Sequence, residues 1–276
     1  MSTRPFGARL HRAMEDRGPL CVGIDPHASL LTQWGLSDDV AGLERFALSA
    51  AEAFGPTAAA VKPQSAFFER FGSKGIAVLE RTIASCRDAG AQVILDVKRG
   101  DIGSTARAYA DAYLDATSPL ASDCITASPF LGFGSIDPMI EVARANSAGV
   151  IVLALTSNPE GPEVQHARVG DRSVAGVMLD HLRDLNAGND FGSFGAVVGA
   201  TLESNDEDLR IAGPLLAPGV GAQGGNADSV RRIFAGALDL VLPSVSREVL
   251  GAGPDVAKLR DAVRRLSDEY RVVLSA

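Results

Sequence analysis

Two lysines and two aspartates in the first half of the chain have the types and spacing of an acid–base site. Asp96 and Lys98 stand two positions apart at the end of the apolar run Ala91–Lys98, so in a β-strand their side chains face the same side. Asp101 follows three residues later and can approach Lys98 of its own chain or of a partner subunit. Lys62 ends an earlier apolar run, and only four of the 26 basic residues are lysines. A lysine in such a run is therefore a candidate functional residue.

An alternating Lys-Asp-Lys-Asp array has a defined chemical use. Each carboxylate favours the protonated form of the neighbouring amine, and each ammonium favours the ionised form of the neighbouring carboxylate. We expect such an array to deliver a proton to an atom at which negative charge develops. It does not suit a Schiff-base lysine, because that chemistry needs a lowered lysine pKa.

A glycine-rich segment and an arginine in the last quarter of the chain predict a phosphate site. Residues 218–225 read PGVGAQGG, and these glycines would let backbone N–H groups approach a phosphate. Arg247 follows a later apolar run and offers a bidentate guanidinium. In a barrel of parallel strands, both segments would follow the last two strands, which is the usual phosphate site of such barrels. We therefore expect a phosphorylated substrate.

Eight short apolar runs predict the strands that position these residues. The runs are Leu20–Asp25, Thr57–Lys62, Ala91–Lys98, Ser122–Ser128, Gly149–Thr156, Gly195–Thr201, Pro214–Gly219 and Asp239–Pro243. Near-continuous apolar strands are typical of a parallel sheet that is covered on both faces. Helical patterns lie between or after them at Gly75–Ala89, Asn226–Ala235 and Asp255–Leu266.

This alternation in 276 residues, without a linker or low-complexity break, predicts an α/β fold consisting of a single (β/α)8 TIM barrel over residues 1–276. The sixth crossover is short. A doubly wound open sheet is the alternative, but the turn after the first strand reads DPHASL and lacks the glycine fingerprint of a dinucleotide-binding fold. Catalytic residues of TIM barrels lie at the carboxyl ends of the strands, so we expect the charged array to converge there with Asp25.

The composition excludes several classes of function. A formal net charge of -8 argues against nucleic acid or an anionic membrane surface as a partner, because both bind clustered positive charge. No apolar stretch is long enough to span a membrane, and residues 1–10 lack the apolar core of a secretory signal, so we expect a cytoplasmic protein. Three widely spaced cysteines, with no CxxC motif or Cys/His cluster, predict reduced core residues and no metal site.

Together, these motifs resemble those of the orotidine 5′-phosphate decarboxylase family, in particular its longer bacterial branch (type 2). The resemblance covers nearly the whole chain. The matching segments are GIDP at 23–26, AVKPQ at 60–64, DVKRGDI at 96–102 with Thr105, TSNP at 156–159, PGVGAQGG at 218–225 and SR at 246–247. The resemblance implies a homodimeric enzyme that converts orotidine 5′-phosphate to uridine 5′-phosphate, in pyrimidine biosynthesis, without a metal or an organic cofactor.

The resemblance also implies a role for each matching residue. Lys98 would protonate C6 of the pyrimidine as carbon dioxide leaves, with Asp96 facing the substrate carboxylate. Asp25 and Lys62 would hold the ribose hydroxyls. The other implied contacts are Asp101 and Thr105 in the partner subunit's site, Thr156 or Ser157 at the pyrimidine edge, and Gly221, Gln223, Gly224 and Arg247 at the phosphate.

Two other functions fit parts of the same pattern. The spacing D-x-K-x-x-D-I also occurs in related metal-dependent decarboxylases of keto-acid sugar phosphates, and a barrel of this kind could bind a nucleotide without turnover. One residue departs from the family pattern, which often has Gly-Arg-Ser after the last strand. Here Glu248 follows Arg247, and a carboxylate beside a phosphate is unfavourable unless it points away.

Overall fold

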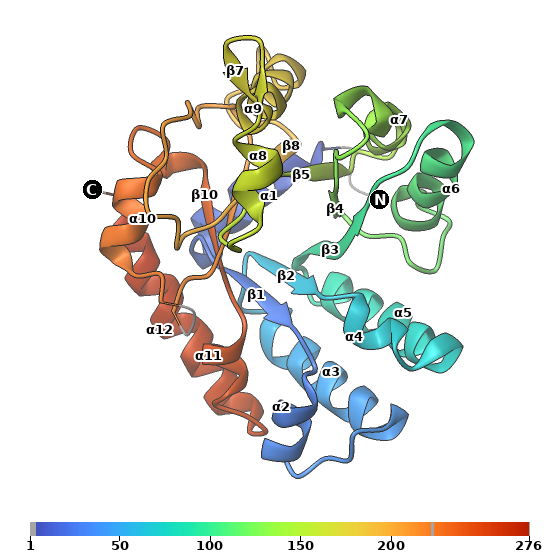
Figure 1. The fold of residues 1–276 in the computed structure, drawn as a ribbon. Coiled ribbons are helices and arrows are strands. Elements are labelled where there is room, and N and C mark those ends of the chain that lie inside the picture. The colour runs from blue at the N-terminus through green and yellow to red at the C-terminus, as the bar shows by residue number, and fades with distance from the viewer. Residues whose placement is uncertain (1–3, 222–223, 276) are drawn as a thin grey trace.

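Eight parallel strands form a closed barrel in the computed structural model, which describes residues 4–221 and 224–275. The strands of the barrel are β1 (Cys21–Ile24), β2 (Ala60–Pro63), β3 (Gln92–Arg99), β4 (Cys124–Ala127), β5 (Gly149–Leu155), β8 (Phe194–Val198), β9 (Leu215–Pro218) and β10 (Val241–Val245). They follow one another around the barrel in chain order, and β10 pairs with β1 to close it (Figure 1). Each strand overlaps one of the eight apolar runs, so the predicted TIM barrel is confirmed.

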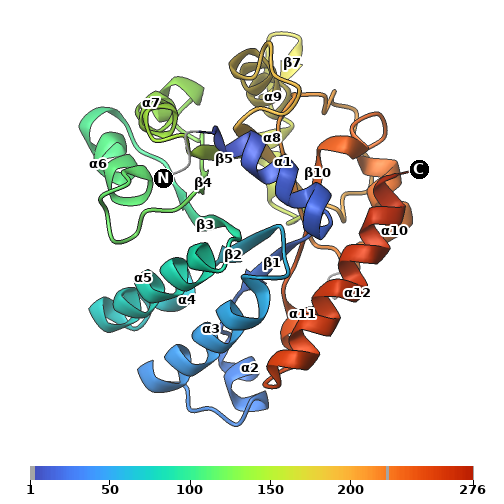
Figure 2. The same ribbon diagram turned by 180° about the vertical axis from the view of Figure 1, so that it is seen from behind.

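Helices surround the barrel (Figures 1 and 2). The longer ones are α3 (Val40–Phe54), α5 (Gly72–Asp88), α6 (Gly103–Leu114), α7 (Asp137–Ala145), α9 (Val174–Leu185), α10 (Ala227–Ile233) and α12 (Val256–Leu274). The short ones are α2 (Ala28–Gln33), α4 (Ala66–Glu69), α8 (Gly161–Gln165), α11 (Arg247–Leu250) and the 3-10 turns η1 (Phe133–Ile136) and η2 (Leu238–Leu240). The three predicted helices are present, and α12 is longer than predicted because its buried positions continue to Val273. None of the described helices is long and apolar enough to cross a membrane.

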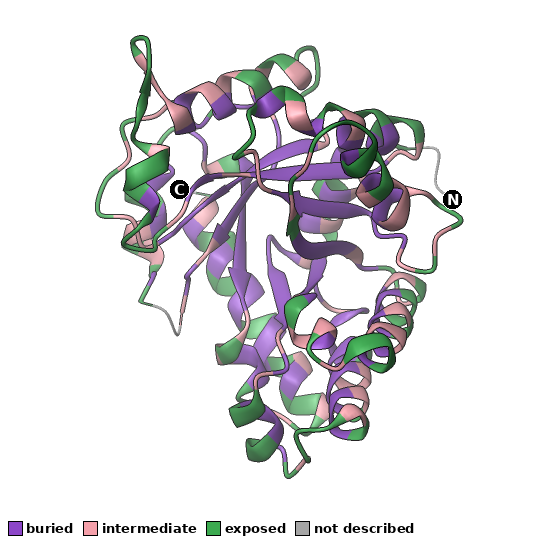
Figure 3. Ribbon diagram, turned by 45° about the vertical axis from the view of Figure 1, so that its right-hand side comes forward, coloured by how far each residue is buried: buried purple, intermediate pink, exposed green. Residues whose placement is uncertain are grey.

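Helix α1 (Phe6–Arg17) closes the N-terminal end of the barrel and lies in front of the strands in Figure 2. Its Phe6, Leu10 and Met14 recur at helical spacing and are buried against the barrel interior. The inward side chains in the same cluster are Cys21, Ala60, Ile94, Cys124, Ile151, Val197, Leu216 and Leu242. A second, larger cluster fills the space between the strands and the outer helices, so the strands are buried on both faces (Figure 3). Side chains of α1 and of the strands therefore fill the barrel interior at its N-terminal end.

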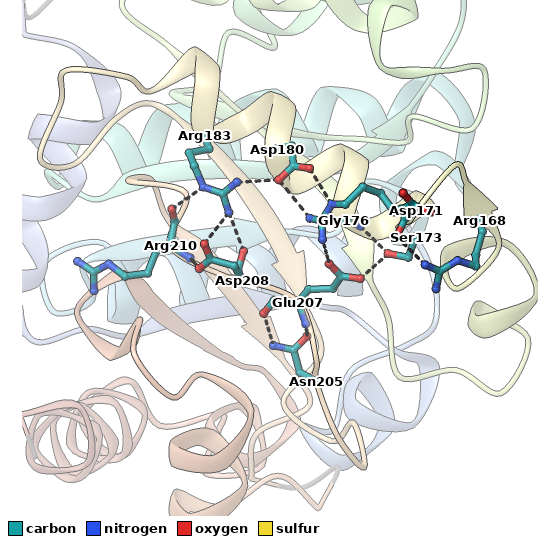
Figure 4. Close-up of polar contacts among 11 residues, drawn as sticks. Arg168, Asp171, Ser173, Gly176, Asp180, Arg183, Asn205, Glu207, Asp208 and Arg210 are labelled. Atoms are coloured by element: carbon teal, nitrogen blue, oxygen red, sulfur yellow. Dashed lines mark hydrogen bonds and ion pairs between the residues drawn. The ribbon is translucent and has the colours of Figure 1, made fainter.

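The crossover between β8 and β9 differs from the others. Residues 199–214 are all described and contain no helix, which accounts for the short sixth crossover. Ion pairs tie this segment to α9 and to the hairpin of β6 (Arg168–Val169) and β7 (Arg172–Ser173). Arg172 pairs with Glu207 at 3.2 Å and Arg183 pairs with Asp208 at 3.1 Å, within the polar network of Figure 4. Ion pairs, together with the buried side chains of Leu209 and Ile211, thus hold a segment that forms no helix.

The three cysteines are free and buried, as predicted for reduced core residues. Burial raises the pKa of the Cys21 and Cys86 thiols to about 12. These thiols therefore stay protonated at neutral pH and are poor nucleophiles.

Candidate active site

The charged residues predicted from the strand ends meet at the mouth of the barrel, opposite α1. Asp25 directly follows β1, Lys62 lies in β2 and Asp96 lies in β3. A cavity of about 190 Å³ opens beside them, lined by Asp25, Lys62, Gln64, Asp96 and residues 218–220 and 244–248. The ends of the first three strands thus meet those of the last two at this cavity. In the described part of the chain, no group of three or more His, Cys, Asp or Glu is arranged to hold a metal ion.

Asp96 is shared between two lysines. Lys62 Nζ donates to Asp96 Oδ2 at 2.8 Å, and Lys98 Nζ donates to Asp96 Oδ1 at 2.6 Å. The Lys62 and Asp96 side chains are 9% and 7% exposed, whereas the Lys98 side chain is 45% exposed. The geometry therefore combines a buried ion pair with an ammonium group on a partly exposed side chain.

The array fixes the charges of its two buried members. Burial opposes the charge of Lys62, but Asp96 and Asp25 outweigh it, so the pKa of Lys62 is raised. Burial also opposes the charge of Asp96, but Lys62 and Lys98 outweigh it, so the pKa of Asp96 is lowered. Both groups are consequently charged at neutral pH, as predicted for an alternating array.

Strand β3 is irregular where it carries the array. Its pairing with β4 shifts register between Leu95 and Arg99. Lys98 has φ of 43°, in the left-handed region that non-glycine residues rarely adopt. Backbone strain of this kind gathers at functional sites, where surrounding contacts hold it in place.

Two polar side chains beside the cavity have buried oxygen atoms, and sequence reasoning assigned a role to only one of these residues. Asp25 Oδ1 and Ser246 Oγ are buried and have no hydrogen-bond partner among the described residues. Both approach Gly23 of β1, where a Cβ atom would come within 2.9 Å of Ser246 Cβ and 3.2 Å of the Asp25 carboxylate oxygens. Glycine at position 23 therefore permits this close arrangement. Ser246 was matched only as part of the SR segment and was given no role, because its neighbour Arg247 carries the obvious phosphate-binding chemistry.

Thr126 of β4 is a second residue that sequence reasoning missed. Its hydroxyl donates to Asp96 Oδ1 at 2.8 Å, so it belongs to the array although it carries no charge. A threonine in the otherwise apolar strand CITA was the only signal in the sequence. That signal is weak, because threonine is common in strands.

The predicted phosphate loop turns sharply above the cavity. Gly219, Gly221 and Gly224 have φ of 98°, 71° and 99°, which glycine adopts without strain. Gly221 N–H donates to the Gly225 carbonyl at 2.8 Å, so part of the loop is held by its own backbone. Gln223 lies outside the described residues. Arg247 begins α11 and is exposed, and its guanidinium forms no hydrogen bond or ion pair with the residues that the structure describes.

Glu248, the departure from the family pattern, is neutralised by α12. Its Oε1 accepts a hydrogen bond from Arg265 at 3.2 Å. Its other oxygen packs against the loop, because a Cβ atom at Gly221 would lie 2.0 Å from Glu248 Oε2. The Arg265 guanidinium thus offsets the negative charge that Glu248 places beside the loop.

The two candidates after β5 differ in how their hydroxyls are used. Thr156 Oγ1 donates to Asn158 Oδ1 at 2.6 Å and accepts from Gln165 Nε2 at 2.7 Å. Ser157 is exposed and has no hydrogen-bond partner among the described residues. Only the Ser157 hydroxyl is therefore available without breaking a contact.

Asp101 and Thr105 do not join the array of their own chain. Asp101 forms no ion pair with Lys98 within the described chain, and its Oδ1 accepts from the Ile102 N–H at 2.8 Å. Thr105, in the first turn of α6, is exposed, and Ile102 is 62% exposed. The sequence allowed Asp101 to approach Lys98 either of its own chain or of a partner subunit. The first of these contacts is absent among the described residues.

Comparison with known proteins places this site in a family. The model of the orotidine 5′-phosphate decarboxylase / HUMPS family matches residues 18–262. A Nocardioides protein named orotidine 5′-phosphate decarboxylase is 69% identical over 273 residues, which cover 97% of this chain and 99% of that protein. Its namesake from Streptomyces coelicolor is 60% identical over 275 residues, which cover 99% of each chain.

A solved structure agrees with these sequence matches. The crystal structure of a Streptomyces avermitilis protein with the same designation superimposes with a TM-score of 0.97 at 61% identity, covering 100% of this chain and 98% of that one. Both the sequence and the fold of the present chain are thus matched over nearly their full length. The chain belongs to the orotidine 5′-phosphate decarboxylase / HUMPS family.

Proposed function

We propose that this chain is a single-domain carboxy-lyase that converts orotidine 5′-phosphate to uridine 5′-phosphate without a cofactor. The observation that carries the proposal is the Lys62–Asp96–Lys98 array beside a glycine-rich loop, in a member of this family. The reaction breaks the bond between C6 of the pyrimidine and its carboxylate carbon. The bonding electron pair stays on C6, carbon dioxide leaves, and a proton from Lys98 Nζ completes the product.

The array suits this reaction electrostatically. Negative charge develops on a carbon with no neighbouring electron sink, so a fixed ammonium at that carbon stabilises the transition state more than the ground state. Asp96 would face the departing carboxylate and hold the Lys98 ammonium group in place through its hydrogen bond. Asp25 and Lys62 would bind the ribose hydroxyls, for which the unpartnered Asp25 Oδ1 is a ready acceptor.

The pyrimidine edge would be recognised after β5. We assign this role to Ser157, because its hydroxyl has no partner within the described chain whereas that of Thr156 is engaged by Asn158 and Gln165. Thr156 would then shape the turn that presents Ser157.

The phosphate would be bound by backbone N–H groups at Gly221 and Gly224, by Gln223 and by Arg247. We expect Arg247→Ala to raise KM roughly 10- to 100-fold, because it removes a charge-assisted bidentate contact. Arg264→Ala on α12 is the matched control, since that arginine is also exposed, and it should leave KM unchanged. Steady-state kinetics over a range of substrate concentrations measures both. Equal KM values for the wild type and Arg247→Ala would contradict the assignment.

The site would be completed by a second copy of the chain, with Asp101 and Thr105 donated across the interface of a homodimer. This proposal is supported by the absence of an Asp101–Lys98 ion pair within the described chain. It is also supported by apolar side chains left in water, because Ile102 is 62% and Phe130 is 75% exposed. Free cysteines fit the cytoplasm as the compartment of such an enzyme.

The direct test is to add orotidine 5′-phosphate in chelator-treated buffer and follow the loss of its ultraviolet absorbance. We expect full turnover with chelator present. Loss of activity in chelator would favour a metal-dependent sugar-phosphate decarboxylase instead. Binding of the nucleotide without turnover would favour a non-catalytic barrel.

A further inference from the structure

The irregular pairing of β3 with β4 places one threonine opposite three residues of the array strand. Leu95 pairs with Ile125 and Arg99 pairs with Ala127, so residues 96–98 of β3 have only Thr126 between those two pairs. Such a bulge leaves backbone groups of the longer strand without their ladder partners. Buried groups of this kind need a replacement acceptor.

The Thr126 hydroxyl is that acceptor. Its Oγ1 accepts from the backbone N–H of Val97 at 3.1 Å and from that of Lys98 at 3.0 Å. The same hydroxyl donates to Asp96 Oδ1 at 2.8 Å. A hydroxyl has one donor and two acceptor positions, so every one of them is used. Thr126 is 1% exposed, so these contacts are buried.

These contacts act on the two residues that the proposed chemistry depends on. Asp96 Oδ1 receives both the Thr126 hydroxyl and Lys98 Nζ, so the hydroxyl limits how the carboxylate can rotate. The Lys98 backbone has φ of 43°, and its N–H is held by the same oxygen. One uncharged atom thereby fixes the strained backbone of Lys98 and the carboxylate that orients its ammonium group.

We propose that Thr126 is a positioning residue, whose hydroxyl holds Lys98 and Asp96 in the geometry needed for proton delivery. This inference rests on the decarboxylase activity proposed above. Thr126 forms no hydrogen bond with the groups assigned to the ribose and phosphate, which lie in β2 or after β1, β9 and β10, and it is linked to Lys62 only through Asp96. Its loss should therefore affect the chemical step more than substrate binding.

Thr126→Val and Thr126→Ser separate this role from packing. Valine keeps the shape but removes the hydroxyl, leaving two backbone donors unpaired and Asp96 with one donor fewer. We expect Thr126→Val to lower kcat roughly 10- to 100-fold, which corresponds to the loss of one or two such contacts, with KM within about threefold of wild type. Serine keeps the hydroxyl, so Thr126→Ser should retain kcat within about threefold of wild type.

The experiment compares the three proteins by steady-state turnover of orotidine 5′-phosphate and by equilibrium binding of uridine 5′-phosphate. Wild-type turnover is measured first, since its absence would refute the proposed function rather than the role of Thr126. With an active wild type, the inference is overturned by any of three results: a Thr126→Val kcat within threefold of wild type, a parallel loss of uridine 5′-phosphate binding, or an equal loss in Thr126→Ser. If Thr126→Val does not fold, Thr126→Cys takes its place, and its weak S–H donor should give a kcat between those of wild type and a tenfold loss.

Discussion

Replacing Lys98 by alanine should lower kcat for orotidine 5′-phosphate by about three orders of magnitude or more. The ammonium group is both the proposed proton donor and the fixed positive charge beside C6, so two contributions are lost together. Uridine 5′-phosphate should still bind, because the proposed ribose and phosphate contacts come from the other strand ends. Single-turnover absorbance measurements and equilibrium binding test the two halves of this expectation separately.

Lys74→Ala is the matched control for this experiment. Lys74 lies in the first turns of α5 and is exposed, so removing its charge should leave kcat unchanged. The proposed mechanism is refuted by near-wild-type turnover in Lys98→Ala. It is also refuted by a drop of equal size in Lys74→Ala, because the effect would then not depend on the array.

Mixing two inactive variants, Lys98→Ala and Asp101→Ala, should restore activity if Asp101 acts in the partner's site. In a heterodimer one site combines the intact Lys98 of one chain with the intact Asp101 of the other, and the second site carries both defects. Random assortment makes about half of the dimers heterodimers, so the mixture should reach about a quarter of wild-type activity. The variants are unfolded and refolded together, or co-expressed with different tags, before turnover is assayed.

A second mixture provides the control for complementation. Lys98→Ala mixed with Asp96→Ala should stay inactive, because Lys98 and Asp96 belong to the same chain's array and every site lacks one of them. Recovery in this control would mean that subunit mixing alone raises activity. Absence of recovery in the Lys98→Ala and Asp101→Ala mixture would show that Asp101 works within its own chain.

The barrel was predictable because its pattern is local. A strand buried on both faces must be apolar along nearly its whole length, and each of the eight strands overlaps such a run. The form of the crossover at residues 199–214 was not predictable, since its contacts include ion pairs from Arg172 and Arg183 and it has no helical apolar pattern. Those partners are distant in sequence, so no window around the segment reveals them.

The candidate site likewise contains some residues that could be predicted from the sequence and others that could not. Lys62, Asp96 and Lys98 were identified because charged residues at the ends of apolar runs are unusual. Thr126 was not identified, because its importance depends on a register shift between β3 and β4 that has no local signature. The Glu248–Arg265 pair was missed for a related reason, since the two residues meet only when α12 packs beside α11.

Because α1 closes one end of the barrel with Phe6, Leu10 and Met14, the cavity among the described strand ends is open only toward the opposite end of the barrel axis. Under the proposed function, substrate and product would share this opening, and a product that has not left would block the next substrate. Competition between product and substrate would then follow from the architecture as well as from their chemical likeness. The packed N-terminal end of the barrel contributes to stability, and the carboxyl ends of the strands hold the candidate site. Substitutions around the cavity can therefore alter specificity without lowering the stability of the packed end.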